Sequence, residues 1–242
     1  MSDENVKDLV IRINPNSTEA TVVVERGGVT AQKTVSIDDL AASLSANHQI
    51  NTGILPRGTR YYAGSGTNFT ICTEAAPRVR NIVFDYYARR QAAIMNGKDK
   101  DYKPSEISIP FPACLFMFVV KGGKLRSSKV AAVKQTLTAT NDMVYRFPFG
   151  NTFHDGRVCW GYNDMPNFEK PMDAVSLMAL FFDAPFNGDL LDSRTVSEFK
   201  DGRKHITDAL TLIKHIEGKE KFPEEALCNL CTFSKLIGDQ DG

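Results

Sequence analysis

The sequence predicts an α+β protein: an antiparallel β-meander with C-terminal helices, and a small β-rich extension at the N-terminus. Segments with strand-like alternation come first, and segments with helical periodicity follow late in the chain. The regular strand-helix alternation of a doubly wound parallel sheet is missing. The 242 residues, 42% apolar and 24% charged, suffice for one large domain with an appendage. We expect residues 1–75 to form the extension and residues 76–242 the main domain.

The first part of the chain predicts an antiparallel meander followed by a short helix. Alternating apolar residues predict strands at 9–13, 21–25 and 29–35, separated by Asn14-Pro15-Asn16 and Gly27-Gly28. Ser36 and Asp39 then form a capping-box-like pair. One apolar face follows this pair, made by Ile37, Leu40, Ala41 and Leu44. These features predict that a helix begins after Ser36.

The middle of the chain combines ambiguous stretches with one clear hairpin. Residues 52–73 are rich in turn formers, and residues 79–93 fit both a strand at 82–87 and a helix ending at Gly97. Residues 96–105 predict a charged surface loop. Two apolar runs at 114–120 and 125–133 flank Gly122-Gly123, whose tolerance of positive φ suits a tight hairpin. A further strand is expected near 143–147.

Two helices are predicted towards the C-terminus. Pro171 suits the first position of a helix and Asp173 its first turn. An apolar stripe extends this helix to residue 182: Met172, Val175, Met178, Ala179 and Phe182. The second helix is expected over 203–217 and ends at Gly218. Its inward face would contain Ile206, Ala209, Leu210, Ile213 and Ile216.

Charge and cysteine content narrow the possible functions. The 29 basic and 29 acidic residues cancel, which argues against a nucleic-acid binder and favours proteins or small molecules as partners. Five cysteines without regular spacing, and no signal-like start, predict a cytoplasmic protein with reduced thiols. The longest apolar runs are far shorter than the roughly 20 residues of a membrane span.

The segment FGNTFHDGRVCWG, residues 149–161, contains residues suited to acyl transfer. Cys159 could act as the nucleophile, because a thiolate in a partly exposed setting rich in hydrogen-bond donors is reactive. Arg157 lies two residues earlier, so both side chains would point to the same side of an extended backbone. His154 is near in sequence, and Asn151 offers an amide that could stabilise an oxyanion. Alternatively, Cys159 is a small buried core residue.

The same segment resembles the active site of ubiquitin-conjugating enzymes. Asn151 lies eight residues before Cys159 and Gly156 three before it, the spacing of the asparagine and glycine in that family. The helix expected up to residue 182, followed by APFNGD at 184–189, also resembles the family's helix and proline-containing loop. The full segment is most similar to the prokaryotic conjugating-enzyme-like family D, which includes the protein B of PRTRC plasmid systems. The resemblance is best over residues 106–195.

Two departures from the family's pattern fall in this segment. Phe149-Gly150 stands where the family has His-Pro, and Trp160 follows the cysteine where an aliphatic residue is usual. The resemblance implies that Cys159 accepts the C-terminal acyl group of a ubiquitin-like protein as a thioester. It also implies that Asn151 serves the discharge step or braces the loop. We include His154 as a third catalytic candidate.

The remaining expectations about the site follow from its surroundings. Gly156, Arg157 and Trp160 are expected to form its substrate-binding wall. The resemblance implies an adenylating activating enzyme and a ubiquitin-like protein as partners, with a metal-dependent deconjugating peptidase as a further candidate. No cofactor or metal is expected. Cys228 and Cys231 form half of a zinc spacing, but no second pair completes it, so we expect core packing on a helix.

Two other functions remain open from the sequence. The same fold could be a noncatalytic scaffold or binding module in a bacterial plasmid or phage-defence complex, with Cys159 unused. A Cys-His hydrolase with His154 as the base is the third possibility, although no carboxylate in a known motif would orient that histidine. Genes for an activating enzyme and a ubiquitin-like protein beside this one would favour conjugation.

Overall fold

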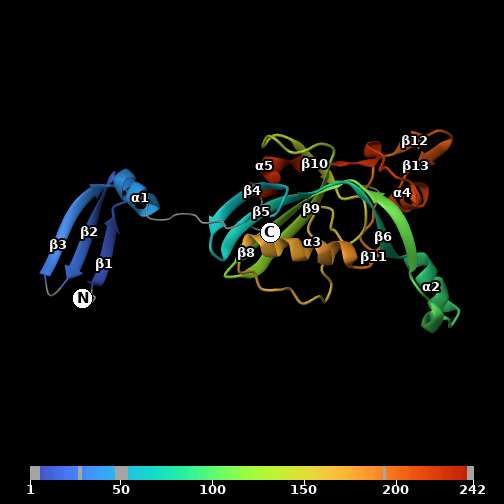
Figure 1. Cartoon of the computed structure of the whole chain (residues 1–242), viewed down its shortest axis with the longest axis horizontal. Helices are drawn as coiled ribbons and strands as arrows, with labels where there is room; N and C mark the ends of the chain where they lie inside the picture. The colour runs from blue at the N-terminus through green and yellow to red at the C-terminus, as the bar shows by residue number, and fades with distance from the viewer. Residues whose placement is uncertain (1–5, 27–28, 47–53, 193–194, 239–242) are drawn as a thin grey trace. The chain divides into compact units, whose positions relative to one another are not determined.

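The computed structural model describes residues 6–26, 29–46, 54–192 and 195–238. The chain divides into two compact units, residues 1–50 and 51–242 (Figure 1). The division differs from the expected boundary at residue 75, because residues 59–75 form two strands that pair within the sheet of the second unit. In the described part of the chain, no helix combines the length and apolar character needed to span a bilayer.

The first unit is the three-stranded meander and helix that the sequence predicts. It contains β1 (Val6–Ile13), β2 (Glu19–Arg26), β3 (Val29–Ser36) and α1 (Ile37–Ala46). Both sheet pairings are antiparallel, with β2 in the centre. The Ser36 hydroxyl accepts a hydrogen bond from the Asp39 backbone N–H at 2.9 Å, which caps the first turn of α1.

The second unit holds the rest of the described structure. Its strands are β4 (Thr59–Ser65), β5 (Asn68–Ala75), β6 (Arg78–Asp85), β7 (Ser105–Phe111), β8 (Ala113–Lys121), β9 (Lys124–Val133), β10 (Met143–Arg146), β11 (Phe186–Asn187), β12 (Phe199–Asp201), β13 (Lys204–Ile206) and β14 (Asn229–Thr232). Its helices are α2 (Tyr87–Met95), α3 (Ala174–Asp183), α4 (Ala209–Ile216) and α5 (Phe233–Gly238). Short 3₁₀ turns are η1 (Asp99–Asp101), η2 (Pro171–Asp173) and η3 (Glu224–Ala226).

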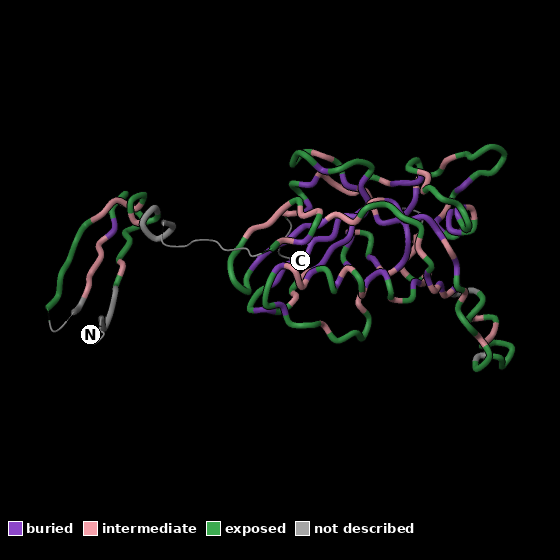
Figure 2. The backbone as a smooth tube through the Cα atoms, viewed as in Figure 1, coloured by how far each residue is buried: buried purple, intermediate pink, exposed green. Residues whose placement is uncertain are grey.

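A six-stranded antiparallel sheet forms the centre of the second unit. Its strand order is β14-β10-β9-β8-β5-β4, and a smaller sheet, β11-β6-β7, contains the one parallel pair among the described strands, β11 with β6. The buried residues concentrate along these strands (Figure 2). Sheets that are mostly antiparallel, with few helices, confirm the predicted α+β class.

The strand β8 explains why the sequence contains a continuous apolar run. Alternate residues of a strand point to opposite faces of the sheet. Phe116 and Phe118 pack in a core that includes α3 and α4, whereas Leu115 and Met117 pack in a second core with Phe233 and Leu236 of α5. The four β8 residues are 0% exposed, and Phe233 and Leu236 are 5% and 2% exposed. Because both faces of the sheet are covered, neither set of alternating positions can be polar.

Aromatic side chains join α3 to the central sheet. Phe116 of β8 contacts Phe181 and Phe182 of α3, with ring centroids 5.4 and 5.2 Å apart. Phe147 and Phe149, which follow β10, contact each other at 5.5 Å, and Phe147 contacts Phe181 at 5.3 Å. Edge-to-face contacts of this kind add to the free energy gained by burying the rings. They fix the chain at the point where residues 150–160 begin.

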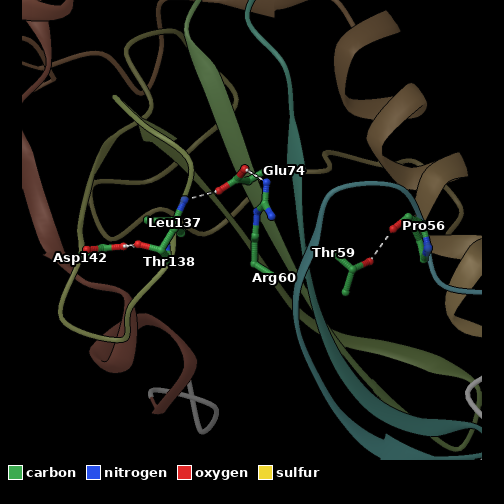
Figure 3. Close-up of polar contacts among 7 residues, drawn as sticks. All are labelled: Pro56, Thr59, Arg60, Glu74, Leu137, Thr138 and Asp142. Carbon is green, nitrogen blue, oxygen red and sulfur yellow. Dashed lines mark hydrogen bonds and ion pairs between the residues drawn. The ribbon is translucent and has the colours of Figure 1, made fainter.

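The loop between β9 and β10 is fastened by carboxylates (Figure 3). Glu74 of β5 accepts a hydrogen bond from the Leu137 N–H at 2.8 Å and pairs with Arg60 of β4 at 2.8 Å. Asp142 accepts the Thr138 N–H at 2.7 Å and the Ala139 N–H at 2.9 Å, and these bonds lower the pKa of Asp142. The loop therefore delivers β10, and the segment after it, in a fixed position.

Several element predictions are confirmed. The Gly122-Gly123 hairpin forms with positive φ angles of 59° and 70°, the strand near 143–147 is β10, and the helix expected from Pro171 is η2 followed by α3. Residues 79–93, which fit both a strand and a helix, contain one of each: the strand β6 and then the helix α2. The turn-rich residues 52–73 contain β4 and most of β5, which the sequence analysis left unassigned.

Two element predictions are wrong. The helix expected over 203–217 begins only at Ala209, because residues 204–206 pair with β12 and Asp208 caps the helix by accepting the Thr211 N–H. The region of Cys228 and Cys231 is not helical: residues 229–232 form β14, paired with β10. Apolar residues at helical spacing also occur where a short strand precedes a short helix.

Candidate functional site

Residues 151–159 form a small antiparallel hairpin that carries Cys159 near its end. The Cys159 N–H donates to the Asn151 carbonyl at 2.8 Å, and the Phe153 N–H donates to the Arg157 carbonyl at 2.8 Å. Thr152 and Val158 form an antiparallel bridge between these two bonds. The Gly156 N–H closes the turn on the Phe153 carbonyl at 3.0 Å. We call this segment the cysteine hairpin.

The two faces of the cysteine hairpin differ in burial. Opposed residues in an antiparallel pair point to the same side, and successive residues alternate. Thr152 and Val158 are 7% and 8% exposed and form the inner face. The outer face follows by alternation and contains Asn151, Phe153, Arg157 and Cys159, of which the last three are exposed. The prediction that Arg157 and Cys159 point to the same side is confirmed for the backbone by this pairing.

Backbone hydrogen bonds attach the cysteine hairpin to the central sheet. The Val158 N–H donates to the Ser128 carbonyl of β9 at 3.0 Å, and the Val130 N–H donates to the Gly156 carbonyl at 2.8 Å. The hairpin therefore continues the sheet along β9 after β10 has ended. Gly156 has φ +86°, and a Cβ there would lie 3.1 Å from the Val130 carbonyl oxygen, so glycine suits this close approach.

Trp160 anchors the residue that follows Cys159. Its indole N–H donates to the Ser128 hydroxyl at 2.8 Å, and its ring meets Phe181 of α3 edge to face at 6.3 Å. Trp160 is half-buried, and these two contacts fasten the cysteine hairpin to β9 and α3. The expected substrate-binding role of Trp160 stays a prediction.

Cys159 is the one exposed cysteine among the five, all of which lie in the described part of the chain. Cys72 and Cys114 are buried, and burial raises the pKa of both thiols, that of Cys114 to about 12. Cys228 is half-buried, with its sulfur 3.2 Å from the Ser197 hydroxyl. The thiol of Cys159 is therefore the one that a large reactant can reach.

Asn151 has an unusual backbone conformation and a fixed side chain. Its φ of +66° lies in the left-handed region, which asparagine tolerates better than most residues. Its side-chain Nδ2 donates to the carbonyl of Pro185, in the loop after α3, at 2.9 Å. The bond ties the start of the cysteine hairpin to that loop, and it occupies one of the two N–H donors of the amide.

The departure from the His-Pro pattern has a structural reason. Phe149 is 1% exposed and packs on Phe111 with ring centroids 4.6 Å apart. A Cβ at Gly150 would lie 2.0 Å from the carbonyl oxygen of Asn187 in β11, closer than real atoms approach. A proline could not occupy this position unless β11 moved. The loop after α3 and the start of the cysteine hairpin are therefore fitted to each other through glycine.

Phe153, Asp155 and Arg157 form a cluster beside Cys159. Arg157 Nε lies 2.7 Å from Asp155 Oδ2, and the Arg157 guanidinium lies over the Phe153 ring, 5.3 Å from its centroid. Burial alone would raise the pKa of Asp155, but hydrogen bonds from the Arg157 backbone and side chain, together with its charge, lower this pKa overall. The positive charge expected beside the cysteine is thus largely balanced.

His154 lies in the turn of the cysteine hairpin and is exposed. Its backbone carbonyl accepts a hydrogen bond from Arg146 at 2.7 Å, and no hydrogen bond joins its ring to Cys159 in the part of the chain described. Three residues not predicted from the sequence support the site from β9 and from the loop after α3: Ser128, Pro185 and Asn187. They are distant in sequence, so only an alignment of related chains could have signalled them.

No metal centre accompanies these residues in the described ranges, where no group of three or more His, Cys, Asp or Glu side chains is placed to hold an ion. The nearest sequence candidate, the Cys228 and Cys231 pair, lies at β14. Its expected lack of a structural metal stays a prediction.

Comparison with known proteins gives one family. No curated protein and no solved structure matches the chain significantly. The family described as prokaryotic E2 family D matches residues 77–230. The match includes the cysteine hairpin, both helices α3 and α4, and all of the central sheet except β4 and β5 and the last residues of β14. It covers more than half of the 242 residues, so the chain belongs to the prokaryotic E2 family D.

Proposed function

We propose that the protein carries the C-terminal acyl group of a ubiquitin-like protein as a thioester on Cys159. The thiolate attacks the thioester carbonyl that joins the ubiquitin-like protein to an activating enzyme, the new carbon-sulfur bond forms, and the activating enzyme's thiolate leaves. An acceptor nucleophile then attacks the Cys159 thioester and releases the Cys159 thiolate. No oxidant, metal or nucleotide takes part on this chain.

The observation that carries the proposal is the exposure of Cys159 on the outer face of a fixed hairpin. Cys159 is exposed, whereas the other four cysteines are buried or half-buried. A thiol that exchanges acyl groups between two proteins must be reached from outside by both partners. The hairpin lies within the residues that match the prokaryotic E2 family D, whose name indicates a role in ubiquitin-like conjugation.

Asn151 has two possible roles in this reaction. Its amide could stabilise the oxyanion of the tetrahedral intermediate during discharge, or it could brace the loop. The 2.9 Å hydrogen bond to the Pro185 carbonyl supports the bracing role. For discharge, the second N–H of the amide or a rotation of the side chain would have to supply the donor. The two roles differ in their effect on thioester loading.

The partners follow from the reaction. An adenylating activating enzyme supplies the thioester, and a ubiquitin-like protein supplies the acyl group. A metal-dependent deconjugating peptidase would reverse the modification. The noncatalytic scaffold of the same fold is the alternative, and the following assay separates the two.

The test is thioester loading on Cys159. Full-length protein is incubated with ATP, a candidate activating enzyme and a candidate ubiquitin-like protein, and a thiol-reducible adduct is followed by nonreducing electrophoresis. Cys159→Ala should abolish the adduct. Cys159→Ser should leave at most a slow, thiol-resistant ester. Cys228→Ala is the matched control, because it removes a half-buried thiol and should load normally.

The outcomes for Asn151→Ala distinguish discharge from bracing. If the amide acts on the tetrahedral intermediate, the variant loads but discharges about 10²- to 10³-fold more slowly. If Asn151 braces the loop, loading and discharge fall together and thermal stability falls with them. A reducible adduct on Cys159→Ala, or a wild-type protein that never loads, would make the scaffold the better description.

A further inference from the structure

The outer face of the cysteine hairpin holds an aromatic surface that the reaction itself does not require. Phe153 is 38% exposed although phenylalanine gains free energy from burial. It lies diagonally across the hairpin from Cys159, since Phe153 opposes Arg157 and Asn151 opposes Cys159. Diagonal neighbours on one face are roughly 7–8 Å apart between Cα atoms, within reach of an aromatic side chain.

Contacts within the hairpin hold this surface in place. The Arg157 guanidinium covers one side of the Phe153 ring, 5.3 Å from its centroid, and Asp155 holds Arg157 at 2.7 Å. The ring therefore loses less conformational entropy on binding a partner than a free side chain would. The ion pair also leaves the surface close to neutral. We call Phe153, Asp155 and Arg157 the aromatic platform.

Trp160 and Tyr162, the described aromatic residues that closely follow Cys159, do not form a comparable surface. Trp160 is turned towards Ser128 and Phe181, so its ring is engaged with the body of the protein. Tyr162 is fully exposed, beyond Gly161 with φ +60°, and its side chain has no hydrogen bond or ring contact in the part of the chain described. An incoming chain gains more from the fixed platform than from the free tyrosine.

We propose that the aromatic platform selects the tail of the acyl donor, by contact with an apolar side chain about two residues before the acyl residue. This inference rests on the proposed function, which puts the acyl carbon on the sulfur of Cys159. An extended chain advances about 3.3 Å per residue, so two residues span the diagonal distance from Cys159 to Phe153. The near-neutral platform gives an apolar side chain an advantage over an acidic one.

Peptide thioesters test the proposal without the unidentified donor. Two hexapeptide thioesters of an alkyl thiol differ only two positions before the acyl residue, with leucine in one and aspartate in the other. The Cys159 thiolate attacks the thioester carbonyl and the alkyl thiolate leaves, so one peptide adds to the protein. The rate is followed by intact mass, and the adduct must be reversed by excess thiol and absent in Cys159→Ala.

The wild-type protein should react about tenfold faster with the leucine peptide, the usual size of a hydrophobic pocket's discrimination. Phe153→Ala should bring the two rates within about twofold of each other. Tyr162→Ala is the matched control, an exposed aromatic outside the platform, and it should keep the preference. Alkylation of Cys159 by iodoacetamide at the wild-type rate shows that each variant keeps the thiol accessible.

The outcomes separate this inference from the proposed function. Equal rates for the two peptides on the wild-type protein overturn the inference, as does a preference that survives Phe153→Ala. If neither peptide reacts while the protein still loads from its activating enzyme, the inference is wrong and the proposed function stands. If Cys159 accepts no acyl group from either source, both fail.

Discussion

The two faces of the cysteine hairpin differ in what they contact: one is attached to the body of the protein, and the other is exposed to solvent. The inner face, the residues flanking the hairpin, and Asn151 at the edge of the outer face form a supporting side. This side is fastened to β9 through Ser128, to α3 through Trp160, and to the loop after α3 through Gly150 and Asn151. The outer face carries an exposed thiol and an exposed phenylalanine. Changes on the supporting side should alter stability, and changes on the outer face should alter reactivity.

The largest effect on stability is expected at Gly150. Gly150→Ala would place a Cβ 2.0 Å from the Asn187 carbonyl oxygen, so β11 or the hairpin must move. Overpacking of this kind costs about 3 kcal/mol, which lowers the melting temperature of a protein of this size by about 10 °C. The measurement is thermal unfolding followed by circular dichroism.

Gly188→Ala is the matched control for Gly150→Ala. It lies in the same loop as Asn187, and its Cβ would meet only a Leu210 methyl at 3.9 Å, an ordinary contact. Its melting temperature should stay within about 2 °C of the wild type, since surface substitutions rarely change stability by more than about 0.5 kcal/mol. Similar losses in both variants would mean that the loop after α3 does not support the hairpin.

A smaller effect is expected from the bond between Trp160 and Ser128. Trp160→Phe and Ser128→Ala each remove one partner of the 2.8 Å hydrogen bond, and the double variant removes both. The double-mutant cycle should give a coupling free energy of about 1 kcal/mol, typical of a neutral hydrogen bond. Chemical denaturation supplies the four free energies of unfolding. A coupling near zero would show that Trp160 is held by packing on Phe181 alone.

Two substitutions of Asn151 should differ in stability by about as much as the Trp160–Ser128 coupling free energy. Asn151→Ala loses the bond to Pro185 and keeps a Cβ at φ +66°, whereas Asn151→Gly loses the same bond without that strain. A left-handed conformation costs an ordinary residue about 1 kcal/mol, so the alanine variant should be less stable than the glycine variant by this amount. Equal stabilities would indicate that the hairpin relaxes out of the left-handed conformation when the amide is removed.

Local signals in the sequence were enough for the N-terminal meander, for β8 to β10, and for the choice of Cys159 as the candidate nucleophile. Alternation in the meander, the two glycines between β8 and β9, and the proline that begins η2 are each determined within a few residues. The two-residue spacing of Arg157 and Cys159 predicted that they share a side of the backbone, whereas the choice between an exposed and a buried Cys159 stayed open. These features depend on backbone geometry that neighbouring residues set by themselves.

Long-range features of the site could not be predicted from one sequence. Ser128 lies 32 residues before Trp160, and Pro185 lies 34 residues after Asn151. Nothing in the residue types of Ser128 or Pro185 distinguishes them from other serines and prolines. The helix predicted over 203–217 failed for a related reason: the pairing that makes residues 204–206 a strand comes from β12, and helical spacing alone cannot exclude it.

The smallest effect on stability is expected from Asp155, on the edge of the outer face. The pKa of Asp155 is lowered in the folded protein, so its contribution is present above the unfolded pKa of about 3.9 and is lost as the pH falls through the folded pKa. Because the Arg157 and Asp155 side chains are 49% and 36% exposed, solvent screens the pair and it is worth about 0.5 kcal/mol. Asp155→Asn should lower the melting temperature by about 1–2 °C at pH 7, and by less at pH 3.

Asp155→Asn should lower stability but raise the reactivity of the Cys159 thiol. Asp155→Asn frees the charge of Arg157, two residues from Cys159 on the same face, and an unbalanced cation favours the reactive thiolate. Alkylation of Cys159 by iodoacetamide at pH 7 should therefore become a few-fold faster while stability falls slightly. Asp164→Asn, an exposed carboxylate in the following loop with no ion pair among the described residues, should change neither quantity. The contradicting outcome is that Asp155→Asn slows the alkylation of Cys159 in proportion to the stability it loses. In that case the reactivity of the thiol would depend on the stability of the hairpin, and the outer face would not act separately from the supporting side.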